Sequence, residues 1–275
     1  MGKFNTNAVL FNLGGASVLV FVAGYMATGV FDSAKVDACS KRFPVGVQYA
    51  LDGTNGAALS TIEMQARAGM RAWGMLENAK VVQSNDATAP KRLDVKLAPA
   101  RSNDDEHQNG IGFIWPVASL QGAQSACLSY NIMIPQDLTF SQPVRLPGLT
   151  GFDASADAAA QSLMAHIGWS SSGELGVEIR TPTTTDSWLS ASKTTVWPRG
   201  RWVQVDQELV MNEPGQSNGA VRVWIDGDLR VERLDLNMRP TADMKFTGVV
   251  ADTGYIRREG DVATVSMTPF VVQWQ

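Results

Sequence analysis

The chain has 275 residues, of which 44% are hydrophobic and 18% charged, and its formal net charge is −4. Proteins that bind nucleic acid without sequence preference are normally basic, so this balance argues against a nucleic-acid partner. The two cysteines form no C-x-x-C and no zinc-ligand spacing, and no Gly-rich phosphate loop is present, so we expect no cofactor.

The first predicted element is a membrane anchor. Residues 8–31 contain no charged side chain and are long enough to cross a hydrocarbon core as a helix. The run is longer than the apolar part of a cleaved signal peptide, the competing interpretation. We therefore expect an N-terminus in the cytoplasm and a periplasmic body. Small residues such as Ala23 and Ala27 let membrane helices approach closely, so the anchor could also pack on other membrane subunits.

Residues 32–45 are predicted to be a polar linker that ends after Pro44, and residues 46–275 to be the folded domain. Cys39 lies in this linker and Cys127 in the domain. In an oxidising compartment the two could form one disulfide, and otherwise they would be unrelated thiols.

The rest of the chain has the pattern of an all-β protein. Residues 60–80 are the best helix candidate, although Gly69 and Gly74 interrupt them. Elsewhere short alternating segments, such as "GIGFIWPV", "SLMAHIGW" and "AVRVWIDG", are separated by turn residues. Asp226-Gly227 is a strong hairpin signal. Many antiparallel strands and almost no helix predict a concanavalin-like β-jelly-roll sandwich of two antiparallel sheets.

A family resemblance appears in the segments "LSYNIMIPQDLTF", "VRLPGL" and "RGRWVQVDQELVMNEPGQSNGAVRVWIDGDLRV". Their order resembles polysaccharide lyase family 14, which contains alginate lyases and relatives that cleave glucuronans. The resemblance is strongest over residues 126–236. It implies β-elimination on an acidic, uronate-containing polysaccharide. That reaction needs a cation to neutralise the uronate carboxylate, a base for the C5 proton and an acid for the departing O4.

The resemblance also implies positions for the reacting groups. The lysine of the family's "K-L-P-G-L" motif matches Arg145, and a family arginine on the following strand matches His166. The family's serine two residues earlier falls on Met164. A Tyr-x-Tyr pair on the next strand falls near Glu178 and Arg180, so neither position holds a tyrosine here.

The alternation of apolar and polar residues within 163–180 points to the same residues, independently of the family resemblance. The core set is apolar, and pairing Trp169 with Leu175 would place His166 opposite Glu178. His166, Glu178 and Arg180 would then share one face turned away from the core. They form either an acid/base group or a solvated cross-strand ion pair. Core positions expected from this alternation are Leu163, Ala165, Ile167, Trp169, Leu175, Val177 and Ile179.

Several other residues are weaker candidates. Tyr255 is expected in a loop, where it could lean over the site as an acid. Tyr130 alternates with Leu128 and Ile132 and is expected in the core. His107 lies in an acidic turn whose run of residues 104–106 could bind calcium, although the spacing fits no known loop. Sugar-stacking candidates are Trp188, Trp197 and Trp202.

Three functions follow from these observations. The first is an anchored lyase in which Arg145 neutralises the carboxylate, His166 or Tyr255 transfers the proton, and Glu178 orients His166. The second is a non-catalytic relative that binds glycan or serves as an accessory subunit of a membrane complex. The third is a hydrolase that uses Glu174 and Glu178, which requires two carboxylates facing one groove.

Overall fold

A computed structural model describes residues 38–68, 72–99, 109–153, 162–181, 184–257 and 260–275. One compact unit extends from Asp37 to Gln275. The predicted anchor, residues 8–31, lies outside the described residues. Among the residues that are described, no helix is long and apolar enough to cross a membrane.

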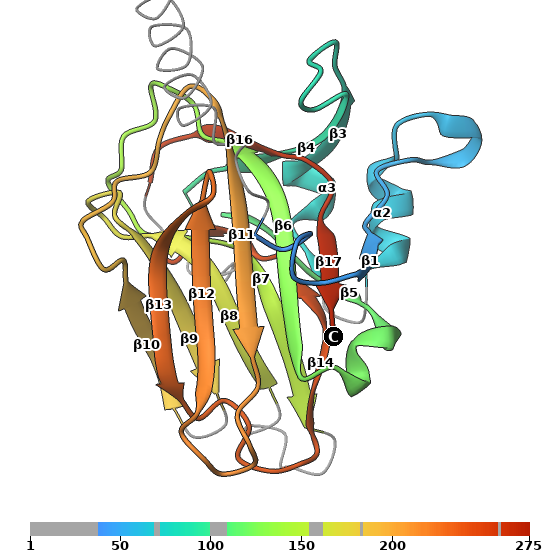
Figure 1. The fold of residues 1–275 in the computed structure, drawn as a ribbon. Coiled ribbons are helices and arrows are strands. Elements are labelled where there is room, and N and C mark those ends of the chain that lie inside the picture. The colour runs from blue at the N-terminus through green and yellow to red at the C-terminus, as the bar shows by residue number, and fades with distance from the viewer. Residues whose placement is uncertain (1–37, 69–71, 100–108, 154–161, 182–183, 258–259) are drawn as a thin grey trace, which may run out of the picture. The chain divides into compact units, whose positions relative to one another are not determined.

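The first of two sheets has nine strands, which form one layer of the fold (Figure 1). All of its strand pairs are antiparallel, and β17 leads from β6 to β1 at one side. Its main path runs β13 (Asp228–Leu236), β12 (Gly219–Ile225), β11 (Trp202–Val210), β6 (Ser125–Met133), β16 (Ala263–Met267), β4 (Lys91–Leu97) and β3 (Ala79–Gln83), with β17 (Val271–Trp274) and β1 (Val45–Gln48) beside it.

The second sheet has eight strands and forms the layer behind the first in Figure 1. Its pairs are also antiparallel, so the predicted all-β sandwich of two antiparallel sheets is confirmed. Its path runs β10 (Thr184–Ser190), β9 (Leu175–Thr181), β8 (Ser162–Trp169), β7 (Val144–Asp153), β14 (Met244–Val250), β5 (Gly110–Pro116) and β15 (Thr253–Tyr255), with β2 (Ala72–Trp73) on β5.

The single helix expected over residues 60–80 is not formed. Instead α2 (Thr61–Arg67) begins at a capping box between Ser60 and Glu63, and α3 (Met75–Asn78) follows a left-handed Gly74. β2 lies between the two helices and β3 follows α3, because Gly74 favours a break over a continuous helix. Two 3-10 turns, η1 (Thr54–Gly56) and η2 (Ala118–Gly122), complete the helical content of the described residues.

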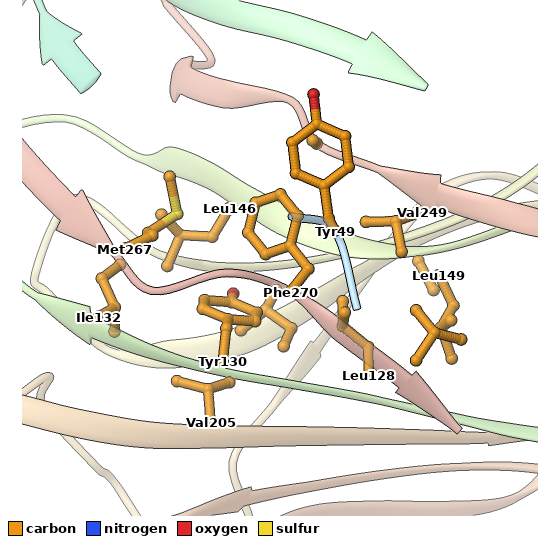
Figure 2. Close-up of a cluster of buried hydrophobic side chains, with 14 of the residues drawn as sticks. Tyr49, Leu128, Tyr130, Ile132, Leu146, Leu149, Val205, Val249, Met267 and Phe270 are labelled. Atoms are coloured by element: carbon orange, nitrogen blue, oxygen red, sulfur yellow. The ribbon is translucent and has the colours of Figure 1, made fainter. Parts of the chain in front are cut away.

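The core fills the space between the inner faces of the two sheets. Figure 2 shows part of it, with Leu128 and Tyr130 of β6 packed near Leu146 and Leu149 of β7. Tyr130 is buried, as the alternation predicted, and its hydroxyl donates to the carbonyl of Pro147. Burial raises the pKa of Tyr130, so this phenol is a packing residue and not a proton donor.

The segment predicted as a linker is part of the domain from residue 38 onward. Cys39 is bonded to Cys127 of β6, and both are fully buried together with Phe43. Arg42 contacts the carboxylate of Glu208 on β11 at 3.1 Å. A disulfide and an ion pair therefore hold Cys39 and Arg42, which lie in the predicted linker, to the nine-stranded sheet.

One irregularity in β7 positions the candidate site. The register between β7 and β8 shifts between Leu146 and Gly148, so that Pro147 is the extra residue of a β-bulge. A side chain on Gly148 would lie 1.7 Å from the carbonyl oxygen of Ala165, so only glycine fits. Gln207 of β11 reaches across the core to this point. Its amide donates to the Ala165 carbonyl at 2.7 Å and accepts from the Leu149 amide at 2.9 Å.

Candidate active site on the eight-stranded sheet

The predicted register of β8 and β9 is confirmed. Trp169 pairs with Leu175, and His166 pairs with Glu178. Every predicted core residue of the two strands is buried within the sandwich. His166, Glu178 and Arg180 therefore share the outer face of the sheet, because side chains alternate along a strand.

Arg145 of β7 joins this face through a bidentate ion pair with Glu178. Its Nε lies 2.5 Å from Oε2 and its Nη2 lies 2.6 Å from Oε1. The contact spans an intervening strand, because the partners of Arg145 along its row are Gly168 of β8 and then Gly176 of β9. Two residues without side chains leave the guanidinium room to lie across β8. Sequence reasoning placed both residues at the site and did not predict this pair.

His166 is less accessible than a solvated ion pair would require. Its side chain is 6% exposed, and its Nε2 lies 3.4 Å from Oδ2 of Asp252, whose side chain is equally buried. Within the described residues Nε2 makes no hydrogen bond of good geometry. Asp252, which lies between β14 and β15, is the residue that sequence reasoning missed. Its only local signal is a carboxylate directly after an apolar strand.

Arg180 and Trp188 flank this group. Arg180 is exposed and pairs in register with Met164 of β8. Trp188 of β10 pairs with Glu178, and a side chain on Gly176 would lie 2.3 Å from its ring. The indole therefore lies against Gly176, on the face that Glu178 also occupies. Of the three tryptophans proposed for stacking on sugars, only Trp188 lies on this face.

Trp197 and Trp202 have structural roles instead. The Trp197 indole is buried and donates to the carbonyl of Gly168 at 2.9 Å. The Trp202 indole donates to the carboxylate of Asp86 at 2.7 Å, which lowers the pKa of that carboxyl. Neither ring joins the row of residues around His166.

Tyr255 does not belong to the site. It lies at the end of β15 rather than in a loop, paired with Val144, and its ring packs in the core. Its hydroxyl donates to the carbonyl of Asp261 at 2.7 Å. Burial, assisted by the nearby Asp261 carboxylate, raises the pKa of Tyr255. The prediction failed because Gly254, not Tyr255, occupies the outward position next to Arg145.

Two predictions cannot be placed. His107 and the acidic run of residues 104–106 lie outside the described residues. Across the described part of the chain, no group of three His, Cys, Asp or Glu side chains could hold a metal ion.

A cavity of about 800 Å³ lies on the other sheet, where β6 changes neighbours from β17 to β16. It contains none of the predicted site residues. Its polar lining is mainly amides and hydroxyls, including Gln48, Asn85, Ser129, Asn131 and Thr268. The charged lining residues, Asp52 and Lys91, are paired with each other. The candidate active site remains the face around His166, where the family resemblance places the reacting groups.

The arrangement around His166 supplies the elements that an elimination needs. Arg145 and Arg180 provide positive charge, and an imidazole lies between the two carboxylates of Glu178 and Asp252. Guanidinium groups bind carboxylates in the bidentate geometry seen between Arg145 and Glu178. The same row holds the imidazole of His166, which has one nitrogen that can accept a proton and one that can donate it.

Comparison with known proteins identifies the family of this chain. The polysaccharide lyase 14 family model matches residues 85–268, which is more than half of the chain. The chain belongs to the polysaccharide lyase 14 family. No sequence among curated proteins matches this family 14 chain.

Solved structures share the fold of this family 14 chain. The marine PL-14 alginate lyase from Aplysia kurodai is 14% identical, with a TM-score of 0.62 over 74% of this chain and 90% of that one. A double mutant of the alginate lyase Aly36B in complex with an alginate tetrasaccharide is 11% identical, with a TM-score of 0.62 over 84% and 97%. The endo-β-1,4-glucuronan lyase from the fungus Trichoderma reesei is 11% identical, with a TM-score of 0.55 over 85% and 96%.

Proposed function

We propose that this chain is a polysaccharide lyase that cleaves a uronate polymer by β-elimination on the outer face of its eight-stranded sheet. The observation that carries the proposal is the convergence of Arg145, His166 and Glu178 on that face. These are the positions at which the family resemblance places the reacting groups. Family membership and the alginate and glucuronan lyases among the similar structures support an alginate- or glucuronan-type substrate.

In the proposed reaction, Arg145 and Arg180 bind the uronate carboxylate and make the C5 proton more acidic. His166 removes that proton, the C4–O4 bond breaks, and a C4–C5 double bond forms. The departing O4 takes up a proton from the imidazolium, so that one group acts first as base and then as acid. The substrate carboxylate must compete with Glu178 for the Arg145 guanidinium, because Glu178 occupies two of its donor positions.

A second candidate, glycan binding without cleavage, is favoured by the same ion pair. Glu178 neutralises Arg145, and the positions that match the family's Tyr-x-Tyr hold Glu178 and Arg180. Trp188, in register with Glu178, offers a sugar an aromatic surface that does not depend on catalysis. The hydrolase is less well supported, because Glu178 is engaged with Arg145 and Glu174 lies outside β9.

The deciding experiment is an assay of the purified full chain for unsaturated uronate on alginate and on glucuronan, followed by ultraviolet absorbance. We expect product from at least one polymer and a loss of about 10²-fold or more in His166→Ala. Lys245→Ala is the matched control. Lys245 lies on the same sheet, in register with Phe152 of β7 and away from the site, so the variant removes a charge without touching the proposed reacting groups. Binding without product, measured by calorimetry, would establish the second candidate, and neither binding nor product would exclude both.

We further propose that the domain works outside the cytoplasm, attached by residues 8–31. The Cys39–Cys127 disulfide supports this location, because such bonds persist in oxidising compartments. The uncharged N-terminal run supports attachment.

Full-length protein should stay with carbonate-washed membranes and be cleaved by protease added to the periplasmic side. Recovery in the soluble cytoplasmic fraction would contradict the proposal. Co-purification at fixed stoichiometry in mild detergent would identify membrane subunits that pack on the anchor.

A further inference from the structure

Asp252 is a buried carboxylate that no motif predicted. Its side chain is 6% exposed, and Oδ2 lies 3.4 Å from Nε2 of His166. A carboxylate withdrawn from water lowers stability unless nearby groups compensate for its lost hydration. At the junction of β14 and β15, this carboxylate faces the imidazole of the candidate site.

The sheet makes space for this carboxylate. A side chain on Gly112 of β5 would lie 2.6 Å from Oδ1 of Asp252 and 2.0 Å from the indole nitrogen of Trp73. The glycine therefore leaves room for both polar groups above one strand. Gly148 is the residue of β7 that pairs with His166, and β7 lies between β8 and β14. His166 thus has a glycine on one neighbouring strand, Glu178 on the other and Asp252 at Nε2.

The charged groups around the imidazole have different partners. Glu178 is held by two hydrogen bonds to Arg145, and Arg180 extends from β9 opposite Met164. Asp252 is the carboxylate whose oxygen is close to an imidazole nitrogen. Its separation of 3.4 Å is long for a hydrogen bond, as is common for catalytic contacts before substrate binds.

We infer that Asp252 is a positioning residue for His166: its carboxylate accepts the Nε2 proton and so leaves Nδ1 as the nitrogen that exchanges a proton with the sugar. The inference rests on the proposed function for its catalytic consequence and on geometry for the contact itself. A carboxylate that accepts from one imidazole nitrogen fixes the ring's tautomer and orientation. Asp252 acts through His166 and has no contact with the substrate in this proposal, whereas Glu178 serves Arg145 and does not orient the imidazole.

Nitrogen-15 NMR of the full chain tests the contact without reference to activity. The chain has only two histidines, His107 and His166, so His107→Gln leaves one imidazole to observe. We expect that imidazole to carry its proton on Nε2 at neutral pH. In Asp252→Asn the carboxamide can donate to Nε2, so the tautomer population should move toward Nδ1–H. Unchanged imidazole nitrogen shifts in Asp252→Asn would overturn the inference.

Kinetics on the polymer that the chain cleaves provide the second measurement. Asp252→Asn should lower kcat by about 10²-fold or more while KM changes by less than about threefold, because the residue acts on the base and not on binding. Asp252→Glu, which retains a carboxylate, should recover part of the lost kcat. Loss of kcat in Asp252→Asn with no recovery in Asp252→Glu and no tautomer change would assign Asp252 a purely structural role.

Asp153 provides the matched control. It is a buried aspartate of the same sheet, near the far end of β7, and it accepts from the Thr241 hydroxyl at 2.6 Å. Asp153→Asn should lower thermal stability without changing the His166 tautomer or kcat. If it changes both as Asp252→Asn does, the inference fails. If no polymer is cleaved even by the unmodified chain, the proposed function fails, and the NMR result still decides the Asp252–His166 contact.

Discussion

The outer faces of the two sheets both carry buried charges, but they are organised differently. On the nine-stranded sheet, Glu208 is 3% exposed and accepts from Arg42 at 3.1 Å and from Arg222 at 2.8 Å, and Arg222 also contacts Glu232. On the eight-stranded sheet, Nε2 of His166 lies 3.4 Å from Oδ2 of Asp252 and has no hydrogen-bond partner among the described residues. A charge whose partners are all provided by the fold stabilises the fold, whereas an incompletely paired titratable group is suited to a ligand.

The largest effect on stability should come from the disulfide that anchors residues 38–43 to the nine-stranded sheet. Cys39 and Cys127 are 88 residues apart, so the chain-entropy model gives a loss of about 4–5 kcal/mol when both become serine. Urea denaturation of the double variant should show this loss. Product formation at low temperature should be retained, because the disulfide lies on the sheet opposite the site. An equal loss of activity in protein that is still folded would show that the two faces are coupled.

The same substitution at the two buried glutamates, Glu208 and Glu178, should distinguish the structural role of one face from the binding role of the other. Glu208→Gln should lower the free energy of unfolding by about 2 kcal/mol, less than for a fully buried pair because Arg42 is half exposed. Glu178→Gln should cost only about 1 kcal/mol, because the Glu178 side chain is 10% exposed and contacts one arginine, whereas Glu208 is 3% exposed and contacts two. Glu178→Gln should also tighten the binding of uronate oligosaccharides severalfold, because the carboxylate no longer competes for the guanidinium.

Denaturation curves and calorimetry on both variants provide the measurement. Tighter oligosaccharide binding in Glu208→Gln, or weaker binding in Glu178→Gln, would contradict the division of roles between the two sheets.

The smallest effect should come from Asp86, a partly exposed residue outside both faces. The Trp202 indole and the Thr88 amide lower the pKa of its carboxyl, so this group stabilises the fold above its unfolded pKa. As pH falls through the lowered pKa of Asp86, that contribution is lost. The difference in Tm between the unmodified chain and Asp86→Asn should therefore shrink in acid. A difference that stays constant with pH would show that the contact is not charge-dependent.

Local sequence patterns were sufficient to predict the strands. They were not sufficient to predict side-chain contacts between strands that are far apart in the sequence. Alternation over residues 162–181 predicted the register of β8 and β9, because one buried face fixes the pairing. It could not predict the Arg145–Glu178 pair, because Arg145 belongs to β7 and reaches Glu178 across β8. Asp252 was missed for the same reason, since it meets His166 only through the order of β8, β7 and β14. Tyr255 was misplaced because one residue of register decides which face it occupies.

The carboxamide of Gln207 connects the core to the backbone of the candidate site. Its bonds to the Leu149 amide and the Ala165 carbonyl lie one residue from Gly148 and from His166, at the bulge that sets their positions. Any shift of the imidazole when a polymer binds must change the protection of the Leu149 proton against exchange with solvent. That single amide, far from any sugar and enclosed by both sheets, is therefore a natural reporter of occupancy on the opposite surface.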